Sequence, residues 1–246
     1  MSERGTAAQR ELRGVIRRRL LVNALVDPDE AARRLPAGLH PHVIEGGTVV
    51  GCCLLDIDRI RPAPLPSPLG MKLRAAAHRI SVEWADGFGG TTVGVYVPVR
   101  HTDSRTARLL GGRWFPGVHR PANVNIVESA DGLCWTVTPA SSAVDFGVRV
   151  TVAIAKQSPS PPCEPIGGTC LSATVAVSPD HHGLLEAAEM RPDRRDAQRV
   201  VIGDLASEFL ASFSTARAAP SYLIRDVSVT WTRGSSPQIA SVGASS

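Results

Sequence analysis

The strongest constraint on the fold is the alternation of apolar, β-branched segments with glycine turns and proline-rich breaks along the chain. The clearest of these segments cover residues 48–57 and 91–100. Roughly ten strand-like segments and about three short helical ones are expected, without the repeating strand–helix rhythm of a parallel α/β sheet. The pattern therefore predicts a mainly β fold of the α+β class, a closed, mostly antiparallel β-barrel with a few short peripheral helices.

Turn and cap signals place the individual elements. Strands are expected at residues 15–26, 42–60 (with a hairpin turn at Gly46-Gly47), 78–84, 91–100, 122–128, 133–138, 144–155, 169–177, 198–202 and 222–233, and residues 184–190 are a strand or a turn of helix. Helices are expected after an N-cap at Asp27, after Thr102 or Asp103 as far as Leu110, and over residues 204–213.

These elements are expected to form one domain. It covers residues 15–233 and is flanked by flexible tails at residues 1–14 and 234–246. The proline-rich stretches 61–68 and 158–165 are predicted to be loops, because proline cannot donate the hydrogen bonds of a β-ladder. Neither stretch separates two segments that have a convincing core of their own.

The charge of the chain argues against a nucleic-acid partner. The 27 basic and 23 acidic residues leave a net charge of +4, and most of the excess lies between Arg4 and Arg19 without a known reading motif. The run Arg17-Arg18-Arg19 is interpreted as a solvated strand start. No apolar run of about 18 residues and no secretory signal is found, so we expect a cytoplasmic protein without a membrane partner. The expected partner is a small molecule, and a homo-oligomer is compatible with the sequence.

Neither a cofactor nor a metal is expected. The five cysteines are odd in number and lack C-x-x-C spacing, and the adjacent Cys52 and Cys53 are predicted to be buried, inert thiols on opposite faces of a strand. His40 and His42 are spaced as a metal-binding pair on a strand, but no third ligand is identifiable. The phosphate loop, the dinucleotide fingerprint and the G-x-S-x-G elbow are all missing.

Schiff-base chemistry rests on two positions. A Schiff base requires an amine that can lose its proton, which arginine cannot provide. Lys72 and Lys156 are the lysines among the 27 basic residues. Both are predicted to be surface residues.

Two segments carry the candidate site. In the segment from Gly111 to Arg120, glycines, aromatic residues, His119 and two arginines converge, so that a ligand could meet the main chain beside a titratable imidazole. The alternative is a turn whose polar side chains face water. In the strand 78–84, Arg79 and Glu83 fall on one face. They provide an acid–base or carboxylate-anchoring pair if that face lines a cavity, and an ordinary surface pair if it does not.

Several motifs together resemble a known family. They are Leu20-Leu21-Val22-Asn23, Val26-Asp27-Pro28, Leu35-Pro36-Ala37-Gly38-Leu39, Ala77-His78-Arg79-Ile80, Gly94-Val95-Tyr96-Val97-Pro98 and Gly111-Gly112-Arg113 with Phe115-Pro116-Gly117-Val118-His119, with weaker matches as far as Val229-Thr230-Trp231. On these motifs, residues 15–233 resemble DUF2071, an uncharacterised family in the acetoacetate decarboxylase-like superfamily.

The resemblance implies a β-barrel with a funnel-like internal cavity. In the decarboxylases a Gly-x-Pro-Lys-Lys segment supplies the lysine that forms the Schiff base. The comparable segment here is Gly117-Val118-His119-Arg120, so His119 and Arg120 would stand in place of the lysine pair. Schiff-base decarboxylation is therefore not expected.

The sequence favours a small-molecule enzyme of this superfamily over a binding protein. It would act on an oxo-acid or polyketide-like carbonyl compound by acid–base chemistry, as a lyase, isomerase or cyclase. The catalytic candidates are His119 and Glu83, and the substrate-binding candidates are Arg120, Arg113, Arg79 and Trp114. The alternative is a non-catalytic barrel that binds a small acidic or apolar ligand through its arginines.

Overall fold

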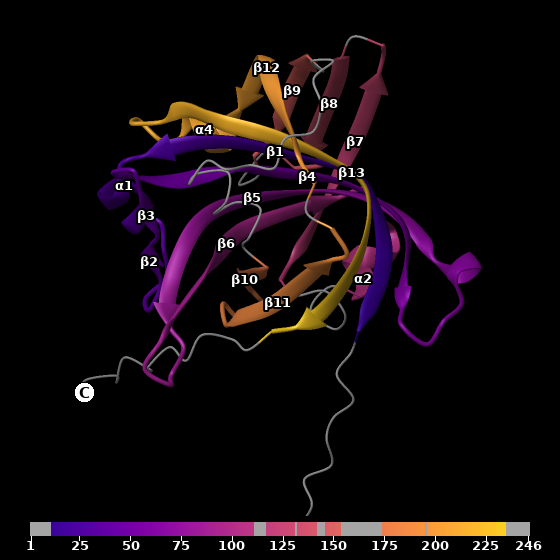
Figure 1. Ribbon diagram of the computed structural model, residues 1–246, viewed down its shortest axis with the longest axis horizontal. Helices are drawn as coiled ribbons and strands as arrows, with labels where there is room; N and C mark the ends of the chain where they lie inside the picture. The colour runs from indigo at the N-terminus through magenta and orange to yellow at the C-terminus, as the bar shows by residue number, and fades with distance from the viewer. Residues whose placement is uncertain are drawn as a thin grey trace, which may run out of the picture.

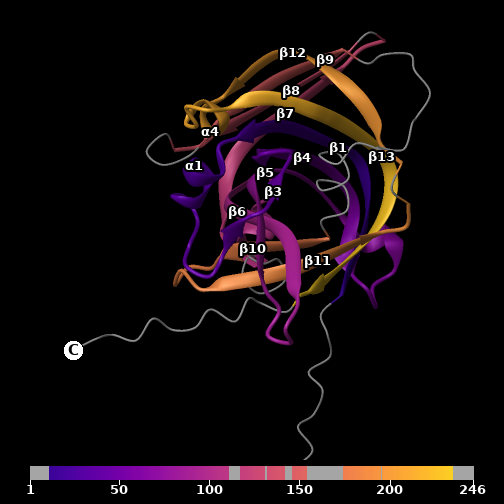
Figure 2. The ribbon, with the colours of Figure 1, turned by 60° about the vertical axis from the view of Figure 1, so that its left-hand side comes forward.

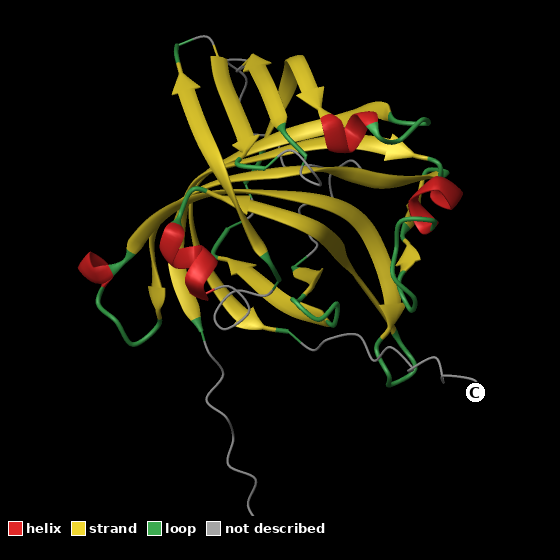
Figure 3. Ribbon diagram, turned by 180° about the vertical axis from the view of Figure 1, so that it is seen from behind, coloured by secondary structure: helices red, strands yellow, loops and turns green. Residues whose placement is uncertain are grey.

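The computed structural model describes residues 11–110, 117–130, 132–141, 146–153, 174–194 and 196–234. Within these residues the strands join into one 13-stranded sheet, and short helices lie at its periphery (Figures 1 and 3). The strands are β1 (Leu12–Val26), β2 (His40–Pro41), β3 (Val43–Ile44), β4 (Gly47–Pro62), β5 (Met71–Ala85), β6 (Thr91–Thr102), β7 (His119–Glu128), β8 (Gly132–Pro139), β9 (Val148–Ala153), β10 (Val175–Pro179), β11 (Leu185–Pro192), β12 (Gln198–Ser207) and β13 (Arg217–Arg233). The helices are α1 (Pro28–Ala32), the 3₁₀ helix η1 (Ser67–Leu69), α2 (Arg105–Leu110) and α4 (Glu208–Ala211).

The predicted closed barrel is confirmed. Strands β1, β4, β5, β6, β7, β8, β9, β12 and β13 pair in that order, and β13 pairs back to β1 to complete nine strands. The long strands β13, β1, β4, β5 and β6 also belong to a second closed ring. In this ring β6 pairs with β10, β10 pairs with β11, and β11 pairs back to β13. Figures 1 and 2 show β7, β8, β9 and β12 on one side of these central strands and β10 and β11 on the other. Two pairings, β6–β7 and β6–β10, are parallel.

The central strands carry a core on each face, because successive side chains of a strand point to opposite sides. Leu20, Leu54 and Ala76 are opposite one another in register and pack in the same cluster as Trp135 of β8, inside the nine-stranded barrel. We call this the barrel face. Their neighbours Leu21, Cys53 and Ala77 belong to a second cluster on the opposite face.

The prediction for the adjacent cysteines is confirmed in its geometry. Cys52 lies in the cluster of the barrel face, whereas Cys53 lies in the second cluster. Both residues are buried free thiols. Burial raises the pKa of Cys52 to about 11, which disfavours its reactive thiolate form.

Local signals placed α1 correctly. Asp27 is the N-cap and accepts hydrogen bonds from the backbone N–H groups of Asp29 and Glu30, and Pro28 opens the helix. The turn at Gly46 is also present, with a φ of 73° that glycine adopts readily. Strand β1 begins at Leu12, three residues before the expected start at residue 15.

Two expectations about helices were wrong in detail. The cap of α2 is neither Thr102 nor Asp103 but Ser104, whose Oγ accepts from the backbone N–H of Ala107 at 3.2 Å. Thr102 Oγ1 donates instead to the carbonyl of Arg74 at 2.9 Å, and the Asp103 carboxylate accepts from the N–H of Arg74 at the same distance. Both side chains therefore hold the strand edge rather than the helix.

The helix expected over residues 204–213 is shorter than predicted, because residues 204–207 belong to strand β12. Residues 205–207 pair with β9, so sheet pairing overrides the local helical pattern and α4 begins only at Glu208. Residues 185–192 form strand β11. Parts of the expected strands 144–155 and 169–177, the break at 158–165 and most of both tails lie outside the described residues.

Among the described residues, no helix combines the length and the apolar character that crossing a membrane requires.

Glu30 yields a prediction about stability. Its carboxylate accepts hydrogen bonds from the hydroxyl of Thr215 and from the N–H groups of Ser214 (2.7 Å) and Thr215 (3.0 Å), which tie α1 to the loop before β13. These bonds lower the pKa of Glu30 from 4.5 to about 2. A lowered pKa stabilises the fold above the unfolded-state value, and the stabilisation is lost as the pH falls towards the folded-state value.

We predict that Glu30→Gln lowers the melting temperature by several degrees at pH 7 and that the difference from the wild type shrinks between pH 5 and pH 2. Thermal unfolding followed by circular dichroism measures this. Glu45→Gln is the control, since Glu45 is exposed. A difference that is independent of pH would contradict the assignment.

Candidate functional site

A single row of side chains crosses the face opposite the barrel face. The register pairs, in turn, Tyr222, Leu21, Cys53, Ala77, Arg100 and His119, contributed by β13, β1, β4, β5, β6 and β7. Directly paired residues of neighbouring strands point to the same side of a sheet. The row therefore ends with a guanidinium beside an imidazole.

Arg100 is held by a hydroxyl and not by an acid. Its Nε and Nη2 both donate to Ser178 Oγ of β10, at 3.2 and 2.9 Å. Burial lowers the pKa of Arg100 to about 10. Within the described part of the chain no carboxylate forms an ion pair with it. The guanidinium is thus partly desolvated without a counter-charge among the described residues.

Arg79 lies on the same face, two residues from Ala77 along β5. It is 3% exposed, and its Nη2 donates to Asn23 Oδ1. Gly51 stands between the two strands at this register and has no side chain, so Arg79 reaches across it. Among the described residues, Nε of Arg79 has no hydrogen-bond acceptor and no carboxylate pairs with the guanidinium.

A bulge in β13 orients the partner of Arg79. The register of β1 with β13 shifts between Leu21 and Asn23, opposite Pro220. The Asn23 side chain donates from Nδ2 to the carbonyl of Pro220 at 2.6 Å, and its backbone N–H donates to Ser221 Oγ at 3.1 Å. Because Nδ2 is engaged there, Oδ1 is directed to Arg79.

Arg19 is the third arginine on this face. It is on β1, two residues before Leu21, and its Nε donates to Cys53 Sγ at 3.4 Å. We call Arg19, Arg79 and Arg100 the arginine cluster and the face that carries them the arginine face. The residues of β4 and β5 between them are small, namely Gly51, Cys53, Ala75 and Ala77. Guanidiniums are therefore the largest polar groups at the centre of this face.

The structure places His119 and Arg120 on opposite faces. They are consecutive in β7, and the register pairs His119 with Arg100 but Arg120 with His101 of the barrel face. The expectation that both side chains serve one site does not hold, because alternation along a strand separates neighbours. Of the two, His119 is the residue that accompanies the arginine cluster.

Arg79 and Glu83 do not form the expected pair. Glu83 lies near the end of β5, and its carboxylate binds Nδ1 of His42 at 2.9 Å. Arg79 binds Asn23 instead. Four residues of extended strand separate the two positions by about 13 Å, too far for contact between them.

The glycine-rich segment meets the site at Gly117. Arg113 and Trp114 lie outside the described residues. Gly117 has a φ of 81°, and a Cβ added to it would come within 2.6 Å of Cβ of Ser178, the residue that binds Arg100. Its N–H donates to Glu186 Oε2 at 3.1 Å, and Glu186 also accepts from Arg233 at 2.7 Å. Only glycine allows this close approach.

Sequence reasoning missed Arg19, Arg100 and Ser178. The run Arg17-Arg18-Arg19 was interpreted as a solvated strand start, but it lies inside β1: Arg17 and Arg18 form ion pairs on one side and Arg19 joins the arginine face. The available signal was charge inside a segment that is otherwise apolar on both faces.

A second group of polar side chains lies on the barrel face and is structural. His78 Nδ1 is 3.4 Å from Cys52 Sγ, and His78 Nε2 is 3.1 Å from the carbonyl of Phe146. The rings of Phe146 and Phe209 pack against His78. In the described ranges, no group of three or more His, Cys, Asp or Glu side chains is arranged to hold a metal ion.

Comparison with known proteins defines the fold. No family model and no curated protein sequence matches the chain. Acetoacetate decarboxylase from Legionella pneumophila subsp. pneumophila str. Philadelphia 1 aligns with a TM-score of 0.60 at 14% identity, over 97% of this chain and 95% of that one. An acetoacetate decarboxylase-like enzyme from Sphingomonas wittichii RW1 gives 0.57 at 14% identity, over 94% and 93%.

A third structure of this kind is the enduracididine biosynthesis enzyme MppR complexed with pyruvate, with a TM-score of 0.56 at 14% identity over 98% of this chain and 94% of that one. The chain thus has the acetoacetate decarboxylase-like fold. The narrower resemblance to DUF2071 stays a prediction.

The arginine cluster yields a second prediction. A buried charge without a counter-charge costs stability, so its replacement by an apolar side chain of similar size is tolerated. We predict that Arg79→Met leaves the melting temperature of the unliganded protein unchanged or raises it, as measured by differential scanning calorimetry.

Arg18→Met is the matched control. Arg18 forms ion pairs with Asp56 (2.7 Å) and Glu128 (2.6 Å). Its loss leaves Asp56 with only a distant guanidinium, Arg74 at 4.0 Å, and leaves Glu128 with Arg225 alone. This variant should melt several degrees lower. A comparable fall for Arg79→Met would show that Arg79 is a structural residue.

Proposed function

We propose that this protein is an enzyme that binds an oxo acid, or a related carbonyl compound with a carboxylate, on the arginine face and moves a proton on it with His119. One observation carries the proposal: Arg79 and Arg100 are two guanidiniums on one interior face that lack a carboxylate partner among the described residues. A buried cation of this kind is complementary to an anionic ligand.

Binding of the ligand's carboxylate is assigned to Arg79 and Arg100. Ser178 occupies Nε and Nη2 of Arg100, and Asn23 occupies Nη2 of Arg79, so each guanidinium keeps N–H groups for a ligand. Asn23 and Ser178 fix the side chains, which reduces the ordering that binding requires. MppR, which has a similar fold, has been solved with pyruvate, a compound that combines a carboxylate with an adjacent carbonyl.

Proton transfer is assigned to His119. It stands opposite Arg100 in the β6–β7 pairing, so its imidazole and the anchoring guanidinium face the same bound molecule. An imidazole can take a proton from the carbon next to a carbonyl, and a neighbouring guanidinium stabilises the negative charge of the resulting enolate. Such a step is compatible with a lyase, an isomerase or a cyclase that acts on an oxo acid.

No lysine is assigned a role in this proton transfer. Lys72 is exposed and borders a pocket at the start of β5, together with Arg74 of the barrel face. Lys156 lies outside the described residues. The location of Lys72 supports a mechanism without a Schiff base at that residue.

Hydrogen–deuterium exchange tests the proton transfer. Pyruvate, 2-oxobutyrate and acetoacetate are incubated with the protein in D₂O, and NMR follows exchange at the carbon next to the carbonyl. We predict that the wild type catalyses exchange in at least one compound. His119→Gln should slow the exchange about 100-fold or more while the dissociation constant changes only a few-fold. Arg100→Met should raise the dissociation constant about 10- to 100-fold.

Glu83→Gln is the control, because Glu83 is bound to His42 and is expected to leave both quantities unchanged. Binding without exchange by the wild type would favour a non-catalytic ligand-binding barrel. Failure of all three compounds to bind would contradict the assignment of an oxo acid.

Borohydride reduction tests the chemistry independently. We predict that treatment with borohydride in the presence of pyruvate or acetoacetate traps no covalent adduct, as judged by intact-protein mass spectrometry. Acetone treated in parallel with a free-amine peptide is the positive control for trapping. An adduct mapped to Lys72 or Lys156 would revive the Schiff-base mechanism.

A further inference from the structure

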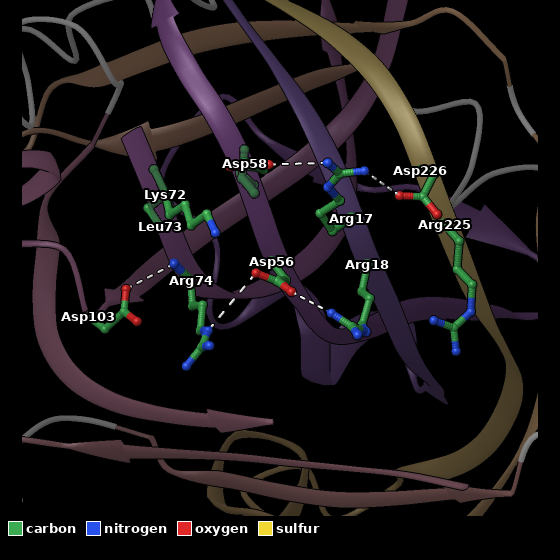
Figure 4. A pocket seen from close by; sticks show the side chains of 11 residues that line it. Arg17, Arg18, Asp56, Asp58, Lys72, Leu73, Arg74, Asp103, Arg225 and Asp226 are labelled. Atoms are coloured by element: carbon green, nitrogen blue, oxygen red, sulfur yellow. Dashed lines mark hydrogen bonds and ion pairs between the residues drawn. The ribbon is translucent and has the colours of Figure 1, made fainter. Parts of the chain in front are cut away.

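A pocket of about 650 Å³ lies on the barrel-face side of the central sheet, away from the arginine face. Its floor is the register row Arg225, Arg18, Asp56 and Arg74, two residues along the strands from the buried row of Leu20 and Leu54 (Figure 4). The volume suits a small metabolite. The lining is almost entirely charged, so an apolar ligand or a hydrophobic protein segment does not fit it.

A β-bulge builds the pocket. The register of β1 with β4 shifts between Ile16 and Arg18, so Arg17 is an extra residue and both arginines line the pocket. The facing residue of β13, Asp226, has a φ of 50°, which non-glycine residues adopt rarely. Bulges and left-handed residues of this kind often re-aim side chains at functional sites.

Most of the charges in the pocket are paired within the protein. Arg17 binds Asp58 at 3.2 Å and Asp226 at 3.0 Å. Arg18 binds Asp56 at 2.7 Å, and Glu128 accepts from both Arg18 and Arg225. In this network three guanidiniums face four carboxylates, so each of these arginines has at least one acidic partner within the protein.

The β5 wall differs from the floor. Lys72 has no ion-pair partner in the part of the chain that the structure describes, and its ammonium points into the pocket (Figure 4). Arg74, two residues further along the same side of β5, is 4.0 Å from Asp56 and donates to the carbonyl of Val124 at 3.3 Å. The nearby Asp103 accepts from the backbone N–H of Arg74 at 2.9 Å. Two cations that make no close ion pair among the described residues therefore lie on the same side of β5.

We propose that this pocket is a second ligand site, which binds the phosphate group of a small phosphorylated metabolite. A phosphate dianion matches the two positive charges of Lys72 and Arg74, and lysine is a common phosphate ligand. The Asp103 carboxylate lies at the same wall as an acceptor for ligand hydroxyl groups. The site is independent of the oxo-acid chemistry, since it lies on the other face of the sheet.

Isothermal titration calorimetry at 150 mM NaCl tests the site with inorganic phosphate and with glycerol 3-phosphate, and glycerol serves as the uncharged analogue. We expect both phosphates to bind the wild type and glycerol not to bind. The double variant Lys72→Gln/Arg74→Gln should lower the association constants at least 10-fold. Arg108→Gln on α2, an exposed arginine that does not line the pocket, is the control for loss of charge.

Three results would overturn the proposal. They are no binding of either phosphate to the wild type, an equal loss of binding in Arg108→Gln, and loss of phosphate binding in Arg79→Met, which would place the anion on the arginine face. If Lys72→Gln/Arg74→Gln unfolds, Lys72→Gln alone, an exposed substitution, must lower the affinity for the proposal to stand. The oxo-acid experiments depend on other residues, so either proposal can fail without the other.

Discussion

The structure depends on the register of the five central strands. These strands are apolar on both faces, so one slip of a single residue would exchange the barrel face with the arginine face. Arg18 and Arg19 are neighbours in β1, yet one joins an ion-pair network and the other contacts Cys53. Bulges keep the register compatible with both closures, because each absorbs an extra residue without reversing the faces beyond it. The barrel face and the arginine face of one sheet therefore carry different sets of side chains.

The arginines on the two faces show how the fold distributes electrostatic cost. Arg17 and Arg18 lie at a half-exposed rim and have carboxylate partners, so their charges are balanced within the protein. Arg79 and Arg100 are bound by an amide and a hydroxyl, which orient a guanidinium without neutralising it. Pre-oriented but unneutralised groups lower the stability of the empty protein and favour a ligand that supplies the missing charge.

Much of the fold could be predicted because its signals are local. Alternating apolar residues, the Asp27 cap and the Gly46 turn each act within a few residues, and the predicted closed barrel is confirmed. The helix expected at residues 204–213 is reduced to residues 208–211, because residues 205–207 pair with the distant strand β9. At these residues the pairing of β12 with β9 outweighs the local preference for a helix.

The site was harder to predict, because its residues come from segments far apart in the sequence. Arg79 meets Asn23 only because β4 joins β5 to β1, which no spacing in the sequence reveals. Arg100 meets Ser178 only because β6 pairs with β10. His119 and Arg120 were expected to serve one site, but alternation along β7 assigns Arg120 to the other face. The sequence segment predicts which types of side chain are available, but the face to which each side chain points depends on the strand register.

The parallel pairing of β6 with β7 explains why His119 is placed opposite Arg100. Parallel neighbours cannot be joined by a tight hairpin, so the chain needs a crossover before it can return in the same direction. That crossover contains α2 and ends at Gly117, whose N–H is held by Glu186 of β11 beside Ser178. The crossover that the parallel pairing requires thus places Gly117 and His119 beside Arg100, which is bound by Ser178 of β10. The chemistry proposed for this face is a consequence of one parallel pairing in an otherwise mostly antiparallel sheet.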